Sequence, residues 1–360
     1  MHIDIPVLVK FRSLPGWCYE ELMGQGVERF FIVSDVRAHD IMRPYIPERA
    51  DVTYVDGAKH GVELLKLLKG EKGSVLIVNG AVLPVGVFSG GAVYSAEAAE
   101  CCKVLKEHGA FAAFPKGAEI TKGFLPVGDD EEIRSAQDMC RRKIADKHFA
   151  AGVSIMDANN SSIDPRVTIG SGTVILPGTI LRGRTVIGKN CTIGPNTMIR
   201  DCVIGDETEV NASQLSESRV GSHTNVGPFA YVRPNSTIGD HVKVGDFVEI
   251  KNSVIGNGTK ISHLTYVGDS DCGERINFGC GTVTTNYDGF KKFRCTIGDD
   301  AFIGCNTNLI APVTVGSGSY IAAGSTITDE VPADSLALAR SRQVNKPGWA
   351  VTWRAAHEKK

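Results

Sequence analysis

One histidine and a few cations supply the side chains in this sequence that could do chemistry. His263 lies in the segment ISHLTY, and an imidazole that titrates near neutral pH can act as a general base. Arg233, Lys251 and Lys292 supply positive charge, and Tyr266 supplies a phenol. Each has a structural alternative, because a lone histidine can serve packing and lone basic residues are usually solvated. The elements that must position these residues therefore matter.

A hexapeptide repeat organises the sequence after residue 160. Aliphatic residues recur every six positions in three runs: 163, 169, 175, 181, 187, 193 and 199; 220, 226, 232, 238, 244 and 250; 297, 303, 309, 315, 321 and 327. Glycine often follows, which gives the unit [LIV]-G-x-x-x-x, and we expect this glycine to absorb the turn dihedrals. A period of six matches neither a helix nor a hairpin meander. It suits a short strand plus a turn, repeated around a prism with the aliphatic residue pointing inward.

Such hexads resemble those of the left-handed parallel β-helix, in which three hexads form one coil of about 18 residues. Residues 163 to 327 would then hold about nine coils, stacked about 4.8 Å apart. The register slips near 199 to 220, and the polar, aromatic and basic segment TTNYDGFKKFRCT at 284 to 296 separates the hexads at Val283 and Ile297. A loop that leaves a regular solenoid is where binding chemistry is expected.

The region from Val226 to Arg340 carries a more specific pattern. It contains, in order, VGPFAYVRPNSTIG, VGDFVEIKNSVIG, ISHLTYVGDSDCG, INFGCGTVTTNYDGFKKFRCTIG, APVTVGSGSYIAAGSTIT and LALARSRQ. These segments resemble the acetyltransferase half of a bacterial bifunctional family, glucosamine-1-phosphate N-acetyltransferase joined to N-acetylglucosamine-1-phosphate uridyltransferase. Weaker similarity reaches back to about residue 130. The resemblance implies a cytoplasmic enzyme that transfers acetyl from acetyl-CoA to α-D-glucosamine 1-phosphate, in UDP-N-acetylglucosamine synthesis for the cell wall.

The resemblance also implies roles for the candidate residues. The catalytic histidine of the family falls at His263, which becomes the general base. The sugar phosphate is assigned to the cations, with Tyr266 beside them; an Arg offers a bidentate fork and a Lys a point charge. Asn277 and Asn286 match positions that hold the sugar and the reacting amine or acetyl group, with Tyr287 adjacent. For Asn286 the structural alternative is a turn over Asn-Tyr-Asp-Gly at 286 to 289.

The acetyl-CoA contacts of the family map to Cys305, Ala323 and Arg340, the last of which could bind the CoA phosphates. Position 305 is commonly serine in the family. A thiol is a weaker donor than a hydroxyl, so Cys305 either contacts the donor or only packs. Cys305 is not a candidate nucleophile, since enzymes of this type generally use direct transfer.

A metal site is a competing interpretation for the histidines. His223 and His241 are 18 residues apart, which is one coil, and they should stack on one face. His263 follows 22 residues later, inside the sugar motifs, so we expect no zinc site and no metal requirement for acetyl transfer. The sequence has 10 cysteines but no CxxC pair, and most are expected to be small buried hydrophobes.

The first half predicts a reduced α/β domain similar to the nucleotidyltransferase domain of the family. We expect strands at 26–34 and 74–80, and a helix at 131–148 whose apolar residues share one face. The expected domains are 1–128 (degenerate nucleotidyltransferase-like), 129–150 (linker helix), 151–335 (β-helix acetyltransferase) and 336–360 (tail). The uncharged stretch 74–96 is interrupted by glycines, Asn79 and Pro84, so it is interpreted as a strand and loop, not a membrane span.

Uridyltransfer is expected to be lost. The family's Gly-rich phosphate loop is replaced by MHIDIPVLVKFRSLPGW at the start of the sequence, and its uridine motif by DGAKHGV at 56 to 62. Its metal-binding Asp corresponds to Gly80-Ala81, and a later Asn ligand to about Gly128. Mg²⁺ needs carboxylate oxygens to bridge it to nucleotide phosphates, so it would be required only if uridyltransfer were retained.

Composition and assembly complete the expectations. A formal charge of -2 argues against bulk nucleic-acid binding, and 40 glycines without a Gly-X-Y period exclude collagen. A β-helix of this kind usually forms a homotrimer with sites between subunits, and the tail with Trp349 and Trp353 could pack on a neighbouring chain. Two alternatives stay open: a bifunctional enzyme that also uses UTP, and a non-catalytic β-helical assembly module. His263 and the 284–296 loop argue against the second, since a pure scaffold needs neither.

Overall fold

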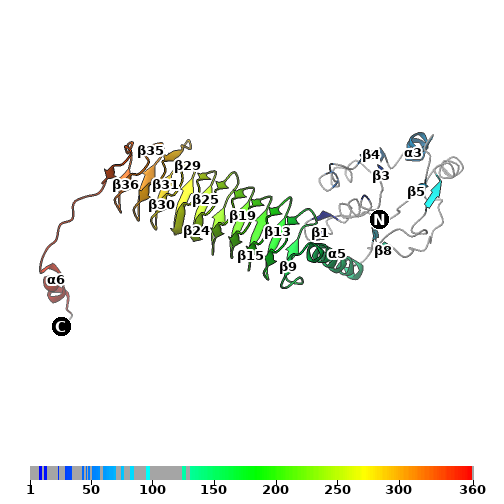
Figure 1. Cartoon of the computed structure of the whole chain (residues 1–360), viewed down its shortest axis with the longest axis horizontal. Coiled ribbons are helices and arrows are strands. Elements are labelled where there is room, and N and C mark those ends of the chain that lie inside the picture. Colours follow the sequence, from blue (N-terminus) through cyan, green and yellow to red (C-terminus); the bar gives the residue numbers. More distant parts are fainter. Residues whose placement is uncertain are drawn as a thin grey trace. The chain divides into compact units, whose positions relative to one another are not determined.

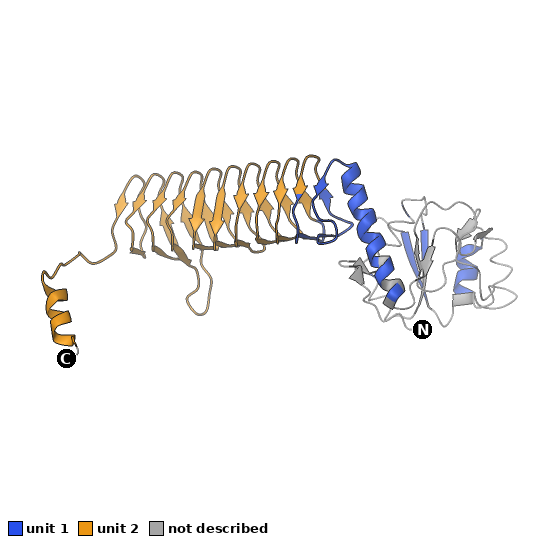
Figure 2. Cartoon of the chain, turned by 90° about the horizontal axis from the view of Figure 1, so that it is seen from below, with its two compact units in different colours: residues 1–168, 175–184 blue, residues 169–174, 185–360 orange. Residues whose placement is uncertain are grey.

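The computed structural model describes residues 130–358 and short stretches of the first 129. Those stretches are 8–9, 12–13, 23, 29–34, 43, 46, 48, 51–56, 60–69, 74–76, 82–84, 95–97 and 124–126. The chain divides into two compact units, residues 1–168 with 175–184, and residues 169–174 with 185–360 (Figure 2). Gly80, Ala81 and Gly128 lie outside the described residues, as do 57–59 of the 56–62 segment.

The described parts of the first 129 residues form short paired strands and one helix. β3 (Arg29–Ser34) pairs in parallel with β4 (Asp51–Asp56), and α3 (His60–Leu68) follows. The remaining pairs are antiparallel: β1 (Leu8–Val9) with β2 (Arg12–Ser13), β5 (Ser74–Leu76) with β7 (Ser95–Glu97), and β6 (Val82–Pro84) with β8 (Phe124–Pro126). α5 then spans Asp130–Ala150, with Cys140 and Ile144 buried on one face.

From residue 154 onward the chain forms parallel coils whose short strands build three sheets (Figure 1). Sheet A has 10 strands, in the order β10 (Ser162–Ile163), β13 (Ile180–Arg182), β16 (Met198–Arg200), β19 (Gln214–Ser216), β22 (Tyr231–Val232), β25 (Glu249–Lys251), β28 (Tyr266–Gly268), β31 (Val283–Thr285), β34 (Asn308–Ile310) and β37 (Thr326–Ile327). Sheet B has 9 strands: β11 (Thr168–Ile169), β14 (Val186–Ile187), β17 (Val203–Ile204), β20 (Arg219–Val220), β23 (Thr237–Ile238), β26 (Val254–Ile255), β29 (Ser270–Cys272), β32 (Cys295–Ile297) and β35 (Val313–Val315). Sheet C has 11 strands: β9 (Ser154–Ile155), β12 (Val174–Ile175), β15 (Thr192–Ile193), β18 (Glu209–Val210), β21 (Asn225–Val226), β24 (Lys243–Asp246), β27 (Lys260–His263), β30 (Asn277–Phe278), β33 (Phe302–Ile303), β36 (Tyr320–Ile321) and β38 (Leu336–Ala337). The predicted parallel β-solenoid is confirmed.

The aliphatic hexads form the core of the coils. The second residue of most two-residue strands points inward, so that positions six apart alternate among the three sheets. All the hexad positions of the three runs are buried except Ile163, which is half-buried in the first sheet A strand. Stacks of Ile, Leu and Val thus fill the interior, and each strand leaves its other side chains outside.

The glycine of the [LIV]-G unit has a different cause from the one expected. At Gly188 and Gly221, φ is not positive, so no left-handed turn requires glycine there. A Cβ on Gly221 would lie 2.5 Å from the carbonyl carbon of Gly239 on the next coil, and one on Gly188 would lie 2.7 Å from Gly205 C. Close approach of successive coils therefore selects glycine. Many of the left-handed corner positions instead carry side chains, among them Asn190, His223, His241, Phe229 and Phe247.

Buried hydroxyls satisfy the corners of the coils. Thr208 Oγ1 donates to Gly221 O at 2.7 Å, and Thr224 Oγ1 donates to Gly239 O at 2.9 Å, each on the next coil. Such bonds serve carbonyl groups that the short strands do not pair. They also explain why Thr and Ser tolerate complete burial at these positions.

The end of the chain carries an exposed aromatic helix. α6 (Trp349–His357) has no buried residue, and the rings of Trp349 and Trp353 stack with centroids 5.2 Å apart. Among the described helices, none is both long and apolar enough to span a membrane. The seven described cysteines are free thiols; five are buried, Cys280 is half-buried and Cys305 is exposed. The expected burial of most cysteines is thus confirmed for the part of the chain that is described.

Candidate active site

His263 is held by a carboxylate on the preceding coil. Asp246 and His263 end the paired strands β24 and β27 in direct register, and His263 Nδ1 lies 2.6 Å from Asp246 Oδ1. A carboxylate only accepts hydrogen bonds, so Nδ1 carries the proton and donates it. The hydrogen bond to His263 holds the pKa of Asp246 below its ordinary value. This arrangement leaves Nε2 as the free basic atom, on a side chain that is 57% exposed.

A row of equivalent positions crosses sheet A, which the chain enters after the corner at His263. Arg233, Lys251 and Gly268 occupy these positions on successive coils, since Tyr231 pairs with Glu249 and Lys251 pairs with Gly268. A Cβ on Gly268 would lie 2.2 Å from the Tyr266 hydroxyl oxygen, so the phenol ring covers this glycine. The missing side chain at 268 makes the space in which Tyr266 lies.

Three cations gather on this face. Arg233 Nη1 donates to Glu249 Oε1 at 2.8 Å, and Lys251 Nζ lies 3.4 Å from Asp269 Oδ2. The side chains of Lys251 and Lys292 interact directly, and this contact lowers the pKa of Lys292 while it raises that of Lys251. The charge of Arg233 lowers the pKa of Lys292 further. Mutual repulsion of this kind is relieved by an anion, so the cluster suits a phosphate group.

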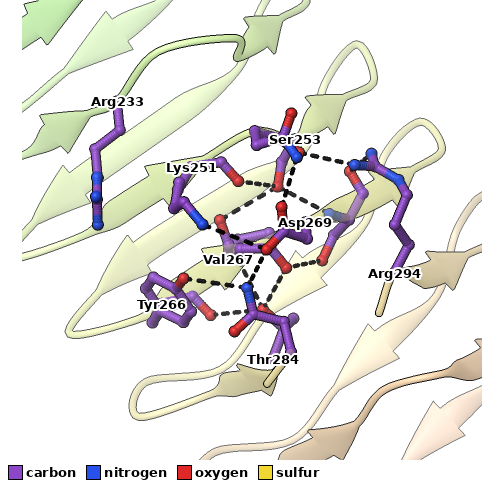
Figure 3. Close-up of polar contacts among 12 residues, drawn as sticks. Arg233, Lys251, Ser253, Tyr266, Val267, Asp269, Thr284 and Arg294 are labelled. Carbon is purple, nitrogen blue, oxygen red and sulfur yellow. Dashed lines mark hydrogen bonds and ion pairs between the residues drawn. The ribbon is translucent and has the colours of Figure 1, made fainter. Parts of the chain in front are cut away.

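Asp269 lies at the centre of the polar contacts in Figure 3, where Lys251 and Tyr266 point toward it. The residue is 4% exposed. Asn252 Nδ2 donates to its Oδ1, and Asn286 Nδ2 donates to its Oδ2. Burial alone would raise the pKa of Asp269, but these two bonds and the charge of Lys251 outweigh burial, so the pKa is lowered. The carboxylate is therefore ionised at neutral pH.

Arg294 fastens the inserted loop to the coils. Its guanidinium group donates to Asp271 Oδ2 at 2.8 Å and to the carbonyl oxygens of Asn252 and Ser270 at 3.0 and 3.1 Å. This residue immediately precedes β32, where the insertion rejoins the solenoid. The ion pair lowers the pKa of Asp271.

The loop itself folds back as a tight turn, which leaves the stack of coils in Figure 2. Tyr287 and Lys292 form an antiparallel bridge, and Phe293 N donates to Asn286 O at 2.9 Å. Asp288 Oδ1 accepts from the backbone N–H groups of Phe290 and Lys291 at 2.7 and 2.6 Å. The turn predicted from Asn-Tyr-Asp-Gly is thus present, while the Asn286 side chain is buried and bonded to Asp269.

A second row of residues runs along the corner between sheets C and A. Strands β27, β30, β33 and β36 pair through Lys260, Asn277, Phe302 and Tyr320. Three residues further along each strand, the equivalent positions are His263, Cys280, Cys305 and Ala323. Gly324 N donates to Cys305 O at 2.8 Å, and a Cβ on Gly324 would lie 3.7 Å from Arg340 Cδ. Cys305, Ala323 and Arg340 therefore follow His263 along one edge of the coils.

Two predicted residues lie apart from these groups. Asn277 is on the outer face of sheet C, in register with Lys260 and Phe302. Tyr287 is 56% exposed on the inserted loop, and its hydroxyl donates to Gly289 O. His223 and His241 stack with parallel rings 4.8 Å apart, as expected. Within the described residues, no group of three His, Cys, Asp or Glu side chains could hold a metal.

The sequence motifs did not point to Asp246, Asp269, Asn252 or Arg294. The available signal is the coil spacing: Asp246 precedes His263 by 17 residues, and Asp269 follows Lys251 by 18 and precedes Asn286 by 17. A search for carboxylates one coil away from each candidate residue would have found both aspartates.

Known proteins share the sequence features of this region. The family described as "Bacterial transferase hexapeptide (six repeats)" matches residues 217–252 and 294–329. The bifunctional protein GlmU of Geobacillus sp. is 47% identical over 247 residues, which are 69% of this chain and 54% of that protein. GlmU of Caldanaerobacter subterraneus subsp. tengcongensis is 53% identical over 232 residues, 62% of this chain and 51% of that protein. The chain thus spans about half the length of the curated relatives it matches. Among solved structures, an Arabidopsis UDP-N-acetylglucosamine acyltransferase aligns with 18% identity and a TM-score of 0.36, over 51% of this chain and 69% of that chain.

Proposed function

We propose that this chain transfers the acetyl group of acetyl-CoA to the amine of α-D-glucosamine 1-phosphate and so serves UDP-N-acetylglucosamine synthesis. One observation carries the proposal. A carboxylate-held imidazole, Asp246–His263, lies at the corner that leads directly into the strand beside the cation cluster of Lys251 and Lys292. The likeness to the GlmU proteins supports the same chemistry.

His263 is the general base of this reaction. Its Nε2 takes a proton from the ammonium group of the sugar, directly or through a water molecule, and releases it to solvent. The neutral amine attacks the thioester carbonyl carbon, the C–N bond forms, and the C–S bond then breaks. The nitrogen gives its remaining extra proton to the departing CoA thiolate, so the products are the amide, the CoA thiol and one proton. Asp246 fixes the tautomer of His263 and stabilises the imidazolium form.

The cations bind the phosphate of the acceptor. Arg233 offers a guanidinium fork, and Lys251 and Lys292 add point charges whose repulsion the phosphate relieves. The amide of Asn286 uses its Nδ2 atom on Asp269, so its Oδ1 atom is the group left to accept a bond from the sugar. Asn277 and Tyr287 complete the acceptor site, and asparagine amides and backbone N–H groups stabilise the developing oxyanion.

The donor binds along the corner between sheets C and A. The thioester lies near His263, the pantetheine arm passes Cys305 and Ala323, and Arg340 binds the CoA phosphates. Four coil steps separate His263 from Arg340, or about 19 Å at about 4.8 Å per step. Acetyl transfer on this scheme requires no metal.

The decisive experiment measures CoA thiol release from acetyl-CoA with glucosamine 1-phosphate as acceptor. We expect turnover that is unaffected by EDTA and absent with N-acetylglucosamine 1-phosphate. His263→Ala should reduce kcat by about 10² to 10⁴, the contribution of general-base catalysis, without changing the molecular mass in solution. Near-normal turnover of that variant would remove His263 as the base.

We further propose that this chain lacks uridyltransferase activity. The proposal rests on the sequence of the first 130 residues, where Gly80-Ala81 and Gly128 replace the expected metal ligands. Pyrophosphate release from UTP and Mg²⁺ with N-acetylglucosamine 1-phosphate tests it. Release at a rate comparable to acetyl transfer would contradict the loss and favour a bifunctional enzyme.

The third part of the proposal is a homotrimer. The rings of Phe229 and Phe247 stack 5.4 Å apart beside the Asp246–His263 corner and are 60% and 58% exposed, with Leu264 next in the row at 56%. An apolar ridge of this kind is typical of a covered surface. Light scattering coupled to size exclusion should give three times the chain mass, and Phe247→Ser should lower it.

A further inference from the structure

We infer that Asp269 is a positioning residue that joins the phosphate-binding lysine to the inserted loop and so sets the affinity for the acceptor. This inference rests on the proposed function. No substrate contact is assigned to Asp269 itself, because its carboxylate lies beneath Lys251 and Asn286 (Figure 3).

The location of Asp269 explains why it can act on two parts of the site at once. It directly follows β28, on the corner where β25 ends one coil earlier and where the loop after β31 begins one coil later. Asn252 and Lys251 approach it from the first side, and Asn286 approaches it from the second. A single buried carboxylate therefore connects three consecutive coils.

Lys251 depends on this carboxylate for its orientation. The lysine side chain is 19% exposed and that of Asp269 is 6% exposed, so the pair is largely shielded from water. Lys292 lies against Lys251 and repels it. Without the negative charge of Asp269, this repulsion would drive the two ammonium groups apart and dissolve the site for a phosphate.

Asn286 depends on it for the choice between its two amide orientations. A carboxylate cannot donate, so Nδ2 of Asn286 must face Asp269, and Oδ1 is presented on the opposite side. With a neutral amide at position 269, this choice would no longer be fixed. Asp269 thus determines that Asn286 offers an acceptor to the ligand, which matches an ammonium or hydroxyl group.

The test replaces the carboxylate by an amide of the same shape. Asp269→Asn should raise KM for glucosamine 1-phosphate about ten-fold or more, because one buried donor loses its acceptor and Lys251 loses its counter-charge. KM for acetyl-CoA should stay within about two-fold of the wild-type value. The matched control is Asp300→Asn, which removes an exposed carboxylate paired with Arg275 on another corner and should leave both constants unchanged.

Calorimetric binding of inorganic phosphate to the resting protein separates this inference from the proposed function. Phosphate affinity that falls in Asp269→Asn supports the inference even if wild-type protein fails to acetylate glucosamine 1-phosphate, a failure that would contradict only the function. Wild-type phosphate affinity and an unchanged acceptor KM in a folded Asp269→Asn protein would overturn the inference. If that variant does not fold, Asn252→Ala removes one donor to the same carboxylate. It should raise the acceptor KM about three-fold, and unchanged constants would again overturn the inference.

Discussion

Asp246 Oδ1 lies 2.6 Å from His263 Nδ1, and the two residues are in direct register on consecutive coils. The carboxylate belongs to the coil before the histidine, so the backbone of the solenoid fixes their separation. A catalytic pair of this type needs no loop to position it.

Removal of the Asp246 charge should slow acetyl transfer without weakening acceptor binding. In Asp246→Asn the amide oxygen can still accept from Nδ1, so the tautomer is kept, but the imidazolium loses its counter-charge. We expect kcat to fall about 10- to 100-fold, and further in Asp246→Ala, which also loses the hydrogen bond. Steady-state kinetics check this. Glu217→Gln, which removes a comparably exposed ion pair with Arg200, serves as the control. Equal kcat in Asp246→Asn and wild type would contradict the role.

The Asp269 network should weaken only in acid. The folded-state pKa of Asp269 is lowered from its ordinary 3.8, so ionised Asp269 stabilises the folded state at every pH above that value. This stabilisation is lost as the pH falls through the lower folded-state pKa. Thermal unfolding of wild type and Asp269→Asn should therefore differ by a constant amount above about pH 5 and converge below about pH 4. A difference that shrinks between about pH 6 and 8 would contradict the assigned direction.

The space above Gly268 should control the position of the Tyr266 phenol. Gly268→Ala places a methyl group 2.2 Å from the present hydroxyl position, so the ring must move away from Asn286. We expect a rise of about five-fold in KM for glucosamine 1-phosphate. Tyr266→Phe is the matched comparison, since it removes only a 3.4 Å hydrogen bond and should have a smaller effect. A larger effect of Tyr266→Phe would show that the hydroxyl matters more than the ring position.

Cys305 should be the most reactive of the described cysteines. It is exposed, whereas burial raises the pKa of Cys202 and Cys295 to about 11 and suppresses their thiolate forms. Iodoacetamide should alkylate Cys305 first, as read by mass spectrometry of peptides, and acetyl-CoA should slow this reaction. Cys305→Ser should keep its activity after the same treatment. Equal labelling with and without acetyl-CoA would place the donor elsewhere.

The core was predictable because the interior of a narrow coil admits only aliphatic side chains, and a period of six therefore appears in the sequence. The burial of Leu181, Ile250 and Ile303 follows from this spacing alone, without any knowledge of tertiary contacts. The role of the following glycine did not follow, because Gly188 is selected by the backbone of another coil, not by its own dihedrals.

The polar partners were harder to predict for a related reason. Residue pairs on consecutive coils are separated by 17 residues for Asp246 and His263, 18 for Lys251 and Asp269, and 23 for Asp271 and Arg294. The insertion and the register slips change the spacing from coil to coil. Motifs located His263 and Lys251, but the carboxylates that hold them depend on which coil length applies.

The corner that runs from His263 past Cys305 and Ala323 to Arg340 has one more consequence. Each coil acts as a graduation of fixed size, so the distance between the base and Arg340 is a whole number of steps of about 4.8 Å. A deletion of residues 306–323 would remove one coil between Cys305 and Arg340. Such a protein would be matched to a donor shorter by one graduation, and the length of the thioester carrier it accepts would change in discrete increments.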